Sequence, residues 1–179
     1  RGGAGTHRSL GAETNRSVVG AQPASRHGRE DWRGLPLVTI DPPDAKDHDD
    51  AVHAALDSAP DNDGGFVLTV AIADVAHYVT PRSALDRDAL ERGNSVYFPD
   101  RVVPMLPERI SNDLCSLRPN EDRPALAVRM RVTSKGRKID HSFHRVMMRS
   151  HAKLAYAQAQ DAIEGRTDAT TKPLLAPVL

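Results

Sequence analysis

Apolar positions along the chain recur with the short period of β-strands. Residues 35–40, 51–56 and 66–74 form three such apolar runs, and turn-forming residues fill positions 58–65. This order predicts a pair of strands joined by a turn. Within 66–74 both alternating sets of side chains are largely apolar, which predicts a strand covered on both faces. The pattern therefore indicates a sheet at the centre of the fold.

The second half of the chain repeats this arrangement and then changes period. Residues 123–133 alternate apolar and basic side chains, and the connection 134–136 leads into a second run, 138–148. A short connection of this kind predicts a β-hairpin. Residues 150–165 are rich in alanine with apolar side chains at helical spacing and a glycine at the end, which predicts a helix.

Capping residues predict a further helix in the middle of the chain. Ser83 is a good N-cap, Asp86 stands three residues later as its capping-box partner, and Gly93 is placed to end the helix. Residues 1–27, by contrast, are rich in Gly, Ser, Ala and Arg and show no sustained apolar periodicity. We expect that segment to be disordered or a linker.

Composition limits the classes that remain. The chain has 179 residues, enough for one domain with a core, and its 24 Lys and Arg balance 24 Asp and Glu. Its single cysteine, Cys115, leaves no disulfide partner and fits a reducing compartment. The longest apolar run, 66–73, is too short to cross a bilayer, and no signal peptide is evident at the start. We expect a cytoplasmic protein.

The strongest chemical signal is a cluster of acidic residues between two apolar runs. Five carboxylates occur within ten residues, at Asp41, Asp44, Asp47, Asp49 and Asp50. Two carboxylates about 4 Å apart repel by roughly 1 kcal/mol in water and roughly 4 kcal/mol at an effective dielectric near 20. A loop held between two strands cannot spread these charges, so a bound cation is favoured over a merely solvated turn. Carboxylate oxygens without nearby cysteine suit Mg²⁺ or Mn²⁺ rather than Zn²⁺.

The spacing Asp41-x5-Asp47-x-Asp49-Asp50 resembles the catalytic signature of the ribonuclease II and ribonuclease R (RNB) exoribonuclease family. Further stretches match that family in the same order, at 70–79, 93–99, 103–107 and 111–119. The sequences of these stretches resemble ribonuclease R more closely than ribonuclease II. The resemblance implies an α+β catalytic domain with a central, mostly antiparallel sheet and flanking helices. Residues 28–179 would form its N-terminal half, and residues 1–27 lie outside the pattern.

The resemblance also implies a reaction and a set of site residues. The reaction is processive 3′-to-5′ hydrolysis of single-stranded RNA to nucleoside 5′-monophosphates, with Mg²⁺ as cofactor and Mn²⁺ as a possible substitute. Asp41 and Asp50 are the implied direct metal ligands. Asp47 and Asp49 complete the metal cluster and are the catalytic residues, Asp49 being essential for the chemical step. Tyr97 is implied to contact the 3′-terminal nucleotide, and we expect a monomer in the full-length form.

Other residues near the acidic cluster and near Tyr97 are expected to lie outside the catalytic set. Asp44 falls outside the family pattern and is expected to be a solvated turn residue. His48 lies between two members of the cluster, so in an extended segment it should point away from them. Phe98 is expected to pack on the core, and Asp74 to cap the turn that follows its strand rather than reach the site.

Two alternatives remain open from the sequence. The chain could be a non-catalytic RNA-binding or regulatory fragment, or another metal-dependent phosphohydrolase that uses Asp47-His-Asp49. Because the RNB catalytic domain extends beyond the matched blocks, we expect the isolated chain to be inactive or nearly so.

Overall fold

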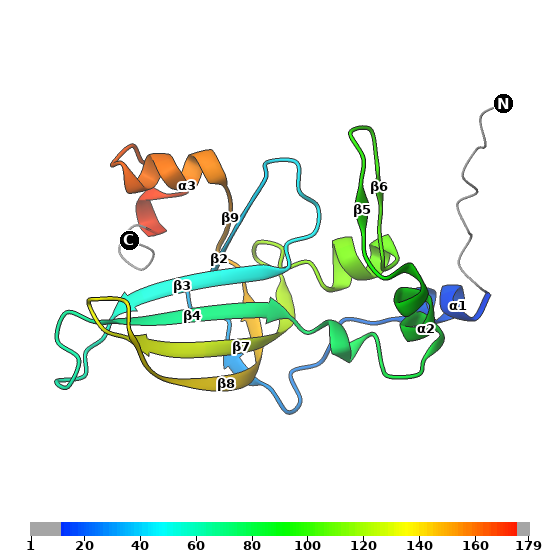
Figure 1. Ribbon diagram of the computed structural model, residues 1–179, viewed down its shortest axis with the longest axis horizontal. Helices are drawn as coiled ribbons and strands as arrows, with labels where there is room; N and C mark the ends of the chain where they lie inside the picture. The colour runs from blue at the N-terminus through cyan, green and yellow to red at the C-terminus, as the bar shows by residue number, and fades with distance from the viewer. Residues whose placement is uncertain (1–11, 175–179) are drawn as a thin grey trace.

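The computed structural model of the chain describes residues 12–174, and a mixed β-sheet is its largest element. The strands of this sheet are β1 (Glu30–Trp32), β2 (Val38–Asp41), β3 (Asp50–Leu56), β4 (Phe66–Ala73), β7 (Asp122–Val132), β8 (Lys138–Arg149) and β9 (Ala152–Ala155). Within residues 12–174 they form one sheet in the order β1-β8-β7-β4-β3-β2-β9 (Figure 1). The outer pairs β1–β8 and β2–β9 are parallel, and the four pairs between them are antiparallel. The predicted α+β class is confirmed.

The remaining elements are short. The helices are α1 (Ala12–Gly20), α2 (Ala84–Arg92) and α3 (Tyr156–Ile163), the 3₁₀ turns are η1 (Val75–His77) and η3 (Lys172–Leu174), and η2 (Arg109–Leu114) is a π-helical segment. A separate two-stranded hairpin is made by β5 (Val96–Tyr97) and β6 (Val102–Val103). Among residues 12–174, every helix is too short or too polar to cross a membrane.

The local signals of the central hairpins and of α2 are confirmed. Strand β3 pairs with β4 over its full length, and β7 continues into β8 through a turn in which Gly136 has a φ of 76°. In α2, the Ser83 hydroxyl accepts a hydrogen bond from the Asp86 backbone N–H at 3.1 Å, and Gly93 ends the helix with a φ of 77°. The predicted helix over 150–165 begins only at Tyr156, because the residues before it form β9.

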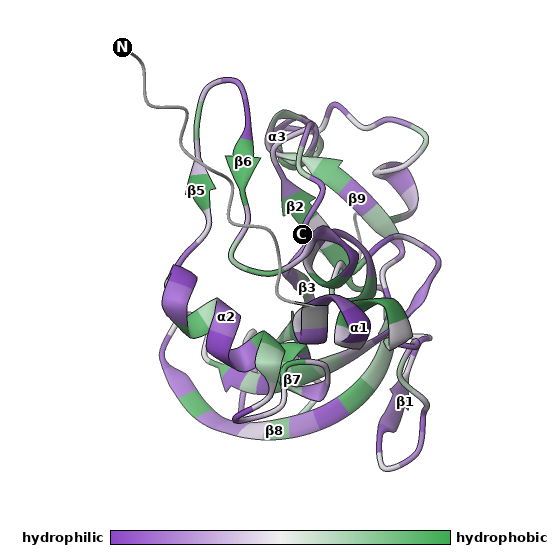
Figure 2. Ribbon diagram, turned by 90° about the vertical axis from the view of Figure 1, so that its right-hand side faces the viewer, coloured by the Kyte–Doolittle hydropathy of each residue, from purple (hydrophilic) through white to green (hydrophobic). Residues whose placement is uncertain are grey.

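The expectation that residues 1–27 are disordered or a linker is wrong for 12–20, which form α1. Val18 reaches the core with 6% of its side chain exposed. Arg109 donates from Nε to the Val18 carbonyl at 3.2 Å and from Nη2 to the Ala21 carbonyl at 3.0 Å. These bonds satisfy carbonyl groups that a helix end leaves open. In Figure 2, α1 and α2 lie side by side, and β8 curves along the bottom of the view below them. Residues 1–11 lie outside the described part.

The two faces of the sheet are covered unequally. Small residues of the central strands, such as Ala51, Ala71 and Ala127, face the main core. On the opposite face Ile72 and Leu126, which are cross-strand partners, are each 48% exposed, and Phe143 is 68% exposed. The prediction that 66–74 is covered on both faces is therefore wrong: only the face that carries alanine and threonine is buried.

Candidate active site

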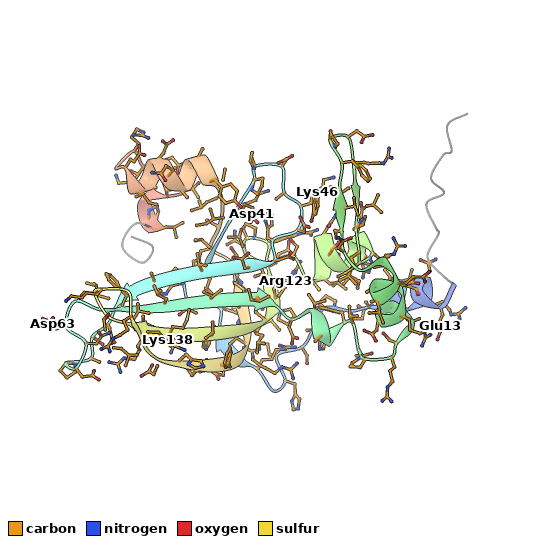
Figure 3. The ribbon with its side chains drawn as sticks, viewed as in Figure 1. Glu13, Asp41, Lys46, Asp63, Arg123 and Lys138 are labelled. Atoms are coloured by element: carbon orange, nitrogen blue, oxygen red, sulfur yellow. The ribbon has the colours of Figure 1, made fainter. Side chains whose placement is uncertain are left out.

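The acidic loop, residues 41–50, connects the end of β2 to the start of β3. Figure 1 shows it rising from the sheet opposite the β5–β6 hairpin, and Figure 3 labels Asp41 near its base and Lys46 on the side toward that hairpin. Asp41, Asp47 and Asp49 line one cavity of about 780 Å³ between the loop and the hairpin. The structure therefore brings three of the four predicted ligands to one cavity, which Asp50 does not line.

The facing wall of the cavity comes from the β5–β6 hairpin and from the segment around η2. The side chains that complete it include Tyr97, Phe98 and Arg101 from the hairpin, and Glu108, Ser111 and Asn112 from that segment. The Tyr97 hydroxyl lies 3.4 Å from Asp47 Oδ2, although the two residues are 50 positions apart. The Asp47 charge raises the pKa of Tyr97. Tyr97 and the acidic loop are thus neighbours, as the prediction of a shared site requires.

The acidic loop is fastened to the buried segment that follows η2. The His48 backbone N–H donates to Ser116 Oγ at 3.1 Å, and the Leu117 N–H donates to the His48 carbonyl at 2.8 Å. Ser116 Oγ in turn donates to the Lys46 carbonyl at 3.2 Å. Ser116 and Leu117 are fully buried, so these bonds tie the middle of the loop to the core.

Burial and the charges of the loop act together on Asp49. Burial raises the pKa of its carboxyl group, and three neighbouring carboxylates raise it further, with a smaller opposing effect of His48. These neighbours are Asp47, Asp50 and Asp41. Neighbouring carboxylates disfavour each other's ionised form, and a nearby cation stabilises that form. The electrostatics of the loop therefore favour binding of a positive ion.

The chemistry of the donors fits a hard divalent cation. The acidic side chains that line the cavity offer only carboxylate oxygens, the ligands that Mg²⁺ and Mn²⁺ prefer. Among residues 12–174, however, no group of three His, Cys, Asp or Glu side chains is placed so that it could hold a metal ion. Asp50 is exposed at the start of β3, where it pairs with Ile72. The four-carboxylate ligand set is not assembled in this arrangement and stays a prediction.

Two expectations about the site are wrong. His48 does not point away from the cluster: its ring is buried, and Nδ1 lies 2.7 Å from Asp41 Oδ2. The alternation rule fails because the loop before Asp50 is not a strand. Phe98 does not pack on the core; it is 46% exposed, with the Arg101 guanidinium 5.3 Å from its ring centre. Asp44 is an exposed turn residue as predicted, and it also lines the cavity.

Asp74 has a different role from the one expected. Its side chain makes no cap hydrogen bond to η1. It instead accepts hydrogen bonds from Arg29 at 2.7 Å and from Arg145 at 3.0 Å. Arg29 and Asp74 are both buried, with side chains 3% and 9% exposed. The local sequence carries no signal for this pair, because its members are 45 residues apart.

Comparison with known proteins gives a consistent result. The family model described as RNB domain matches residues 29–178. Ribonuclease R of Vibrio cholerae is 46% identical over 158 residues, which are 86% of this chain and 19% of that protein. Ribonuclease R of Escherichia coli is 49% identical over 144 residues, or 80% of this chain and 17% of that protein. The chain thus spans about a fifth of the length of these relatives.

Solved structures agree with the sequence matches. Mycoplasma genitalium RNase R in complex with double-stranded RNA superposes with a TM-score of 0.82 at 30% identity, over 90% of this chain and 29% of that one. Yeast Ssd1, a pseudonuclease, shares the fold with a TM-score of 0.68 at 19% identity, over 80% of this chain and 18% of that one. The resemblance inferred from five sequence blocks is confirmed, and the chain belongs to the RNB domain family.

Proposed function

We propose that this chain supplies the acidic half of the active site of a Mg²⁺-dependent exoribonuclease. The enzyme would hydrolyse single-stranded RNA processively from the 3′ end to nucleoside 5′-monophosphates, with Mn²⁺ able to replace Mg²⁺, as a cytoplasmic monomer. The observation that carries this proposal is the cavity shared by Asp41, Asp47, Asp49 and Tyr97 in a relative of ribonuclease R.

The cavity is suited to a nucleotide end. Its volume of about 780 Å³ lies in the range of roughly 300 to 1,000 Å³ that is usual for small-ligand sites. A divalent cation held by Asp41, Asp47, Asp49 and Asp50 would polarise the phosphate and activate a water molecule. Tyr97 is 66% exposed, so its ring is available for stacking on the terminal base. The acidic loop would thus hold the cation that acts on the phosphate, while the β5–β6 hairpin would position the nucleoside.

A second candidate is a non-catalytic RNA-binding module. It is favoured by the lack, within residues 12–174, of three acidic or histidine side chains placed to hold an ion. The two candidates differ in how they depend on Asp49, since a binding module would tolerate its replacement.

The isolated chain is expected to show little or no exonuclease activity. Its carboxylates are not gathered into one ligand set, and apolar side chains such as Ile72 and Leu126 remain exposed on the sheet. A single-turnover assay with 3′-labelled single-stranded RNA and Mg²⁺ tests this. The positive control is a chimera in which the matched segment of this chain replaces that of Escherichia coli ribonuclease R. Robust processive cleavage by the chain alone would refute the expectation; an inactive chimera would count against the proposed function.

Replacing Tyr97 by Ala should weaken binding of single-stranded RNA to the chimera by about 1 to 3 kcal/mol, the usual contribution of one stacked base. Fluorescence anisotropy with a 3′-labelled oligonucleotide measures this. The matched control is Tyr156→Ala, because Tyr156 is similarly exposed, at 61%, but lies on α3 and does not line the cavity. Equal affinities of the two variants would exclude a role of Tyr97 in RNA binding.

A further inference from the structure

His48 is the most enclosed side chain of the acidic loop. Only 4% of the residue is exposed, whereas Asp50, two positions further on, is exposed. A buried histidine has to find partners for its ring nitrogens, since an unpaired polar group in the interior is unfavourable. Its partner here is Asp41, whose Oδ2 lies 2.7 Å from Nδ1.

The place of the imidazole is fixed by the core rather than by the loop. The backbone of His48 is held at both its N–H and its carbonyl, by Ser116 and Leu117. Both partners are fully buried. The ring therefore presents Nδ1 at a defined point beside the end of β2, where Asp41 follows the buried residues of that strand.

The contact distinguishes Asp41 from the other carboxylates of the loop. Within residues 12–174, Asp41 is the member of the predicted ligand set that bonds to a buried side chain. In the same part of the chain, the side chain of Asp47 is bonded to the exposed Tyr97 hydroxyl, at 3.4 Å. A carboxylate whose rotation is already restricted loses less conformational freedom when it binds a cation, and hydrogen bonds behind the ligands of a metal commonly orient them.

We propose that His48 is a positioning residue for the cation site. Its Nδ1–H donates to Asp41 Oδ2 and holds the carboxylate so that Oδ1 is available to a divalent ion in the cavity. This inference rests on the proposed function for the identity of the ion. The contact between His48 and Asp41 can be tested separately from it.

The contact is tested on the chain itself by NMR. Long-range ¹H–¹⁵N correlation spectra of chain labelled with ¹⁵N-histidine show which ring nitrogen carries the proton. We expect a proton on Nδ1 of His48 that is protected from solvent exchange, and an altered signal in the Asp41→Asn variant. A proton on Nε2 alone, or a ring that exchanges freely between tautomers, would overturn the proposal.

The positioning role is tested by Mn²⁺ titration followed by EPR of the free ion. His48→Phe keeps a ring but removes the donor, while His48→Asn places an amide N–H close to the position of Nδ1. Loss of a hydrogen bond behind a ligand typically weakens metal affinity about 10-fold to 100-fold, so we expect a loss of that size in His48→Phe and an affinity near that of the unchanged chain in His48→Asn.

The matched control is His53→Phe, since His53 lies on β3, partly buried and away from the cavity lining. It should leave the Mn²⁺ affinity unchanged, and circular dichroism verifies that the variants fold. Equal affinity of His48→Phe and the unchanged chain, or no recovery in His48→Asn, would contradict the positioning role. If neither the unchanged chain nor its chimera with Escherichia coli ribonuclease R bound Mn²⁺, both the proposed cation site and the positioning role of His48 would be wrong, and the NMR result would still decide the contact.

Discussion

Replacing Asp49 by Asn is expected to lower the rate of RNA hydrolysis about a thousandfold while leaving RNA affinity nearly unchanged. Burial and the neighbouring carboxylates of the loop raise the pKa of the Asp49 carboxyl group. Asn keeps the shape of the side chain but removes the charge that would face the cation. A thousandfold loss corresponds to about 4 kcal/mol of transition-state stabilisation, a reasonable share for one carboxylate of a metal site.

The measurement uses the chimera with Escherichia coli ribonuclease R, with single-turnover rates at saturating Mg²⁺ and RNA affinity by anisotropy. Asp44→Asn is the matched control, because Asp44 is exposed on the same loop and lines the same cavity. It should change the rate only slightly. If Asp49→Asn retained full activity, the assignment of the chemical step would be wrong. A chimera that bound RNA without hydrolysing it, with either residue at position 49, would favour the non-catalytic module.

The parts of the fold that could be predicted are those set by local sequence. The hairpin turn at 134–136 contains a glycine with positive φ, and α2 has its cap at Ser83 and its stop at Gly93. Such features are determined by residues a few positions apart, and the chain carries their signals in full.

The elements that local sequence does not predict are stabilised by residues far away in the chain. Residues 152–155 have the composition of the helix that follows them, yet they form β9 because β2 offers a parallel edge. Helix α1 has little apolar periodicity and is stabilised by Val18 in the core and by Arg109 at its end. In both cases tertiary contacts outweigh local propensity, which is a weak guide for short segments.

In the candidate site, too, some residues could be predicted from the sequence, whereas others depend on the tertiary structure. The spacing of carboxylates indicated a cation site in the acidic loop, and the resemblance added Tyr97, which the structure places 3.4 Å from Asp47. Neither could reveal His48, because its role depends on a loop path that alternation does not describe. The expectation that Phe98 packs on the core is wrong because an aromatic residue in a short connecting segment has no periodicity from which to infer burial.

The second large effect concerns stability: Asp74→Ala is expected to reduce the free energy of unfolding by about 3 to 5 kcal/mol. The substitution leaves the Arg29 guanidinium buried without its carboxylate, and Arg29 Nη1 already has no hydrogen-bond partner among residues 12–174. Removing one member of a buried ion pair typically has a cost of this size. For a chain of this length the unfolding midpoint should fall by about 10 °C, which differential scanning calorimetry measures.

The pH dependence of this effect identifies its cause. Burial alone would raise the pKa of Asp74, but the hydrogen bonds and charges of Arg145 and Arg29 outweigh it and lower the pKa below the usual 3.8. The folded state therefore gains stability from Asp74 above pH 3.8 and loses it as pH falls through the lowered pKa. The difference between Asp74→Ala and the unchanged chain should be complete at neutral pH and shrink in acid. Asp161→Ala, which breaks the exposed pair with Arg166, is the control and should leave the midpoint nearly unchanged. A neutral-pH difference as small as that of the control would show that the buried pair does not stabilise the fold.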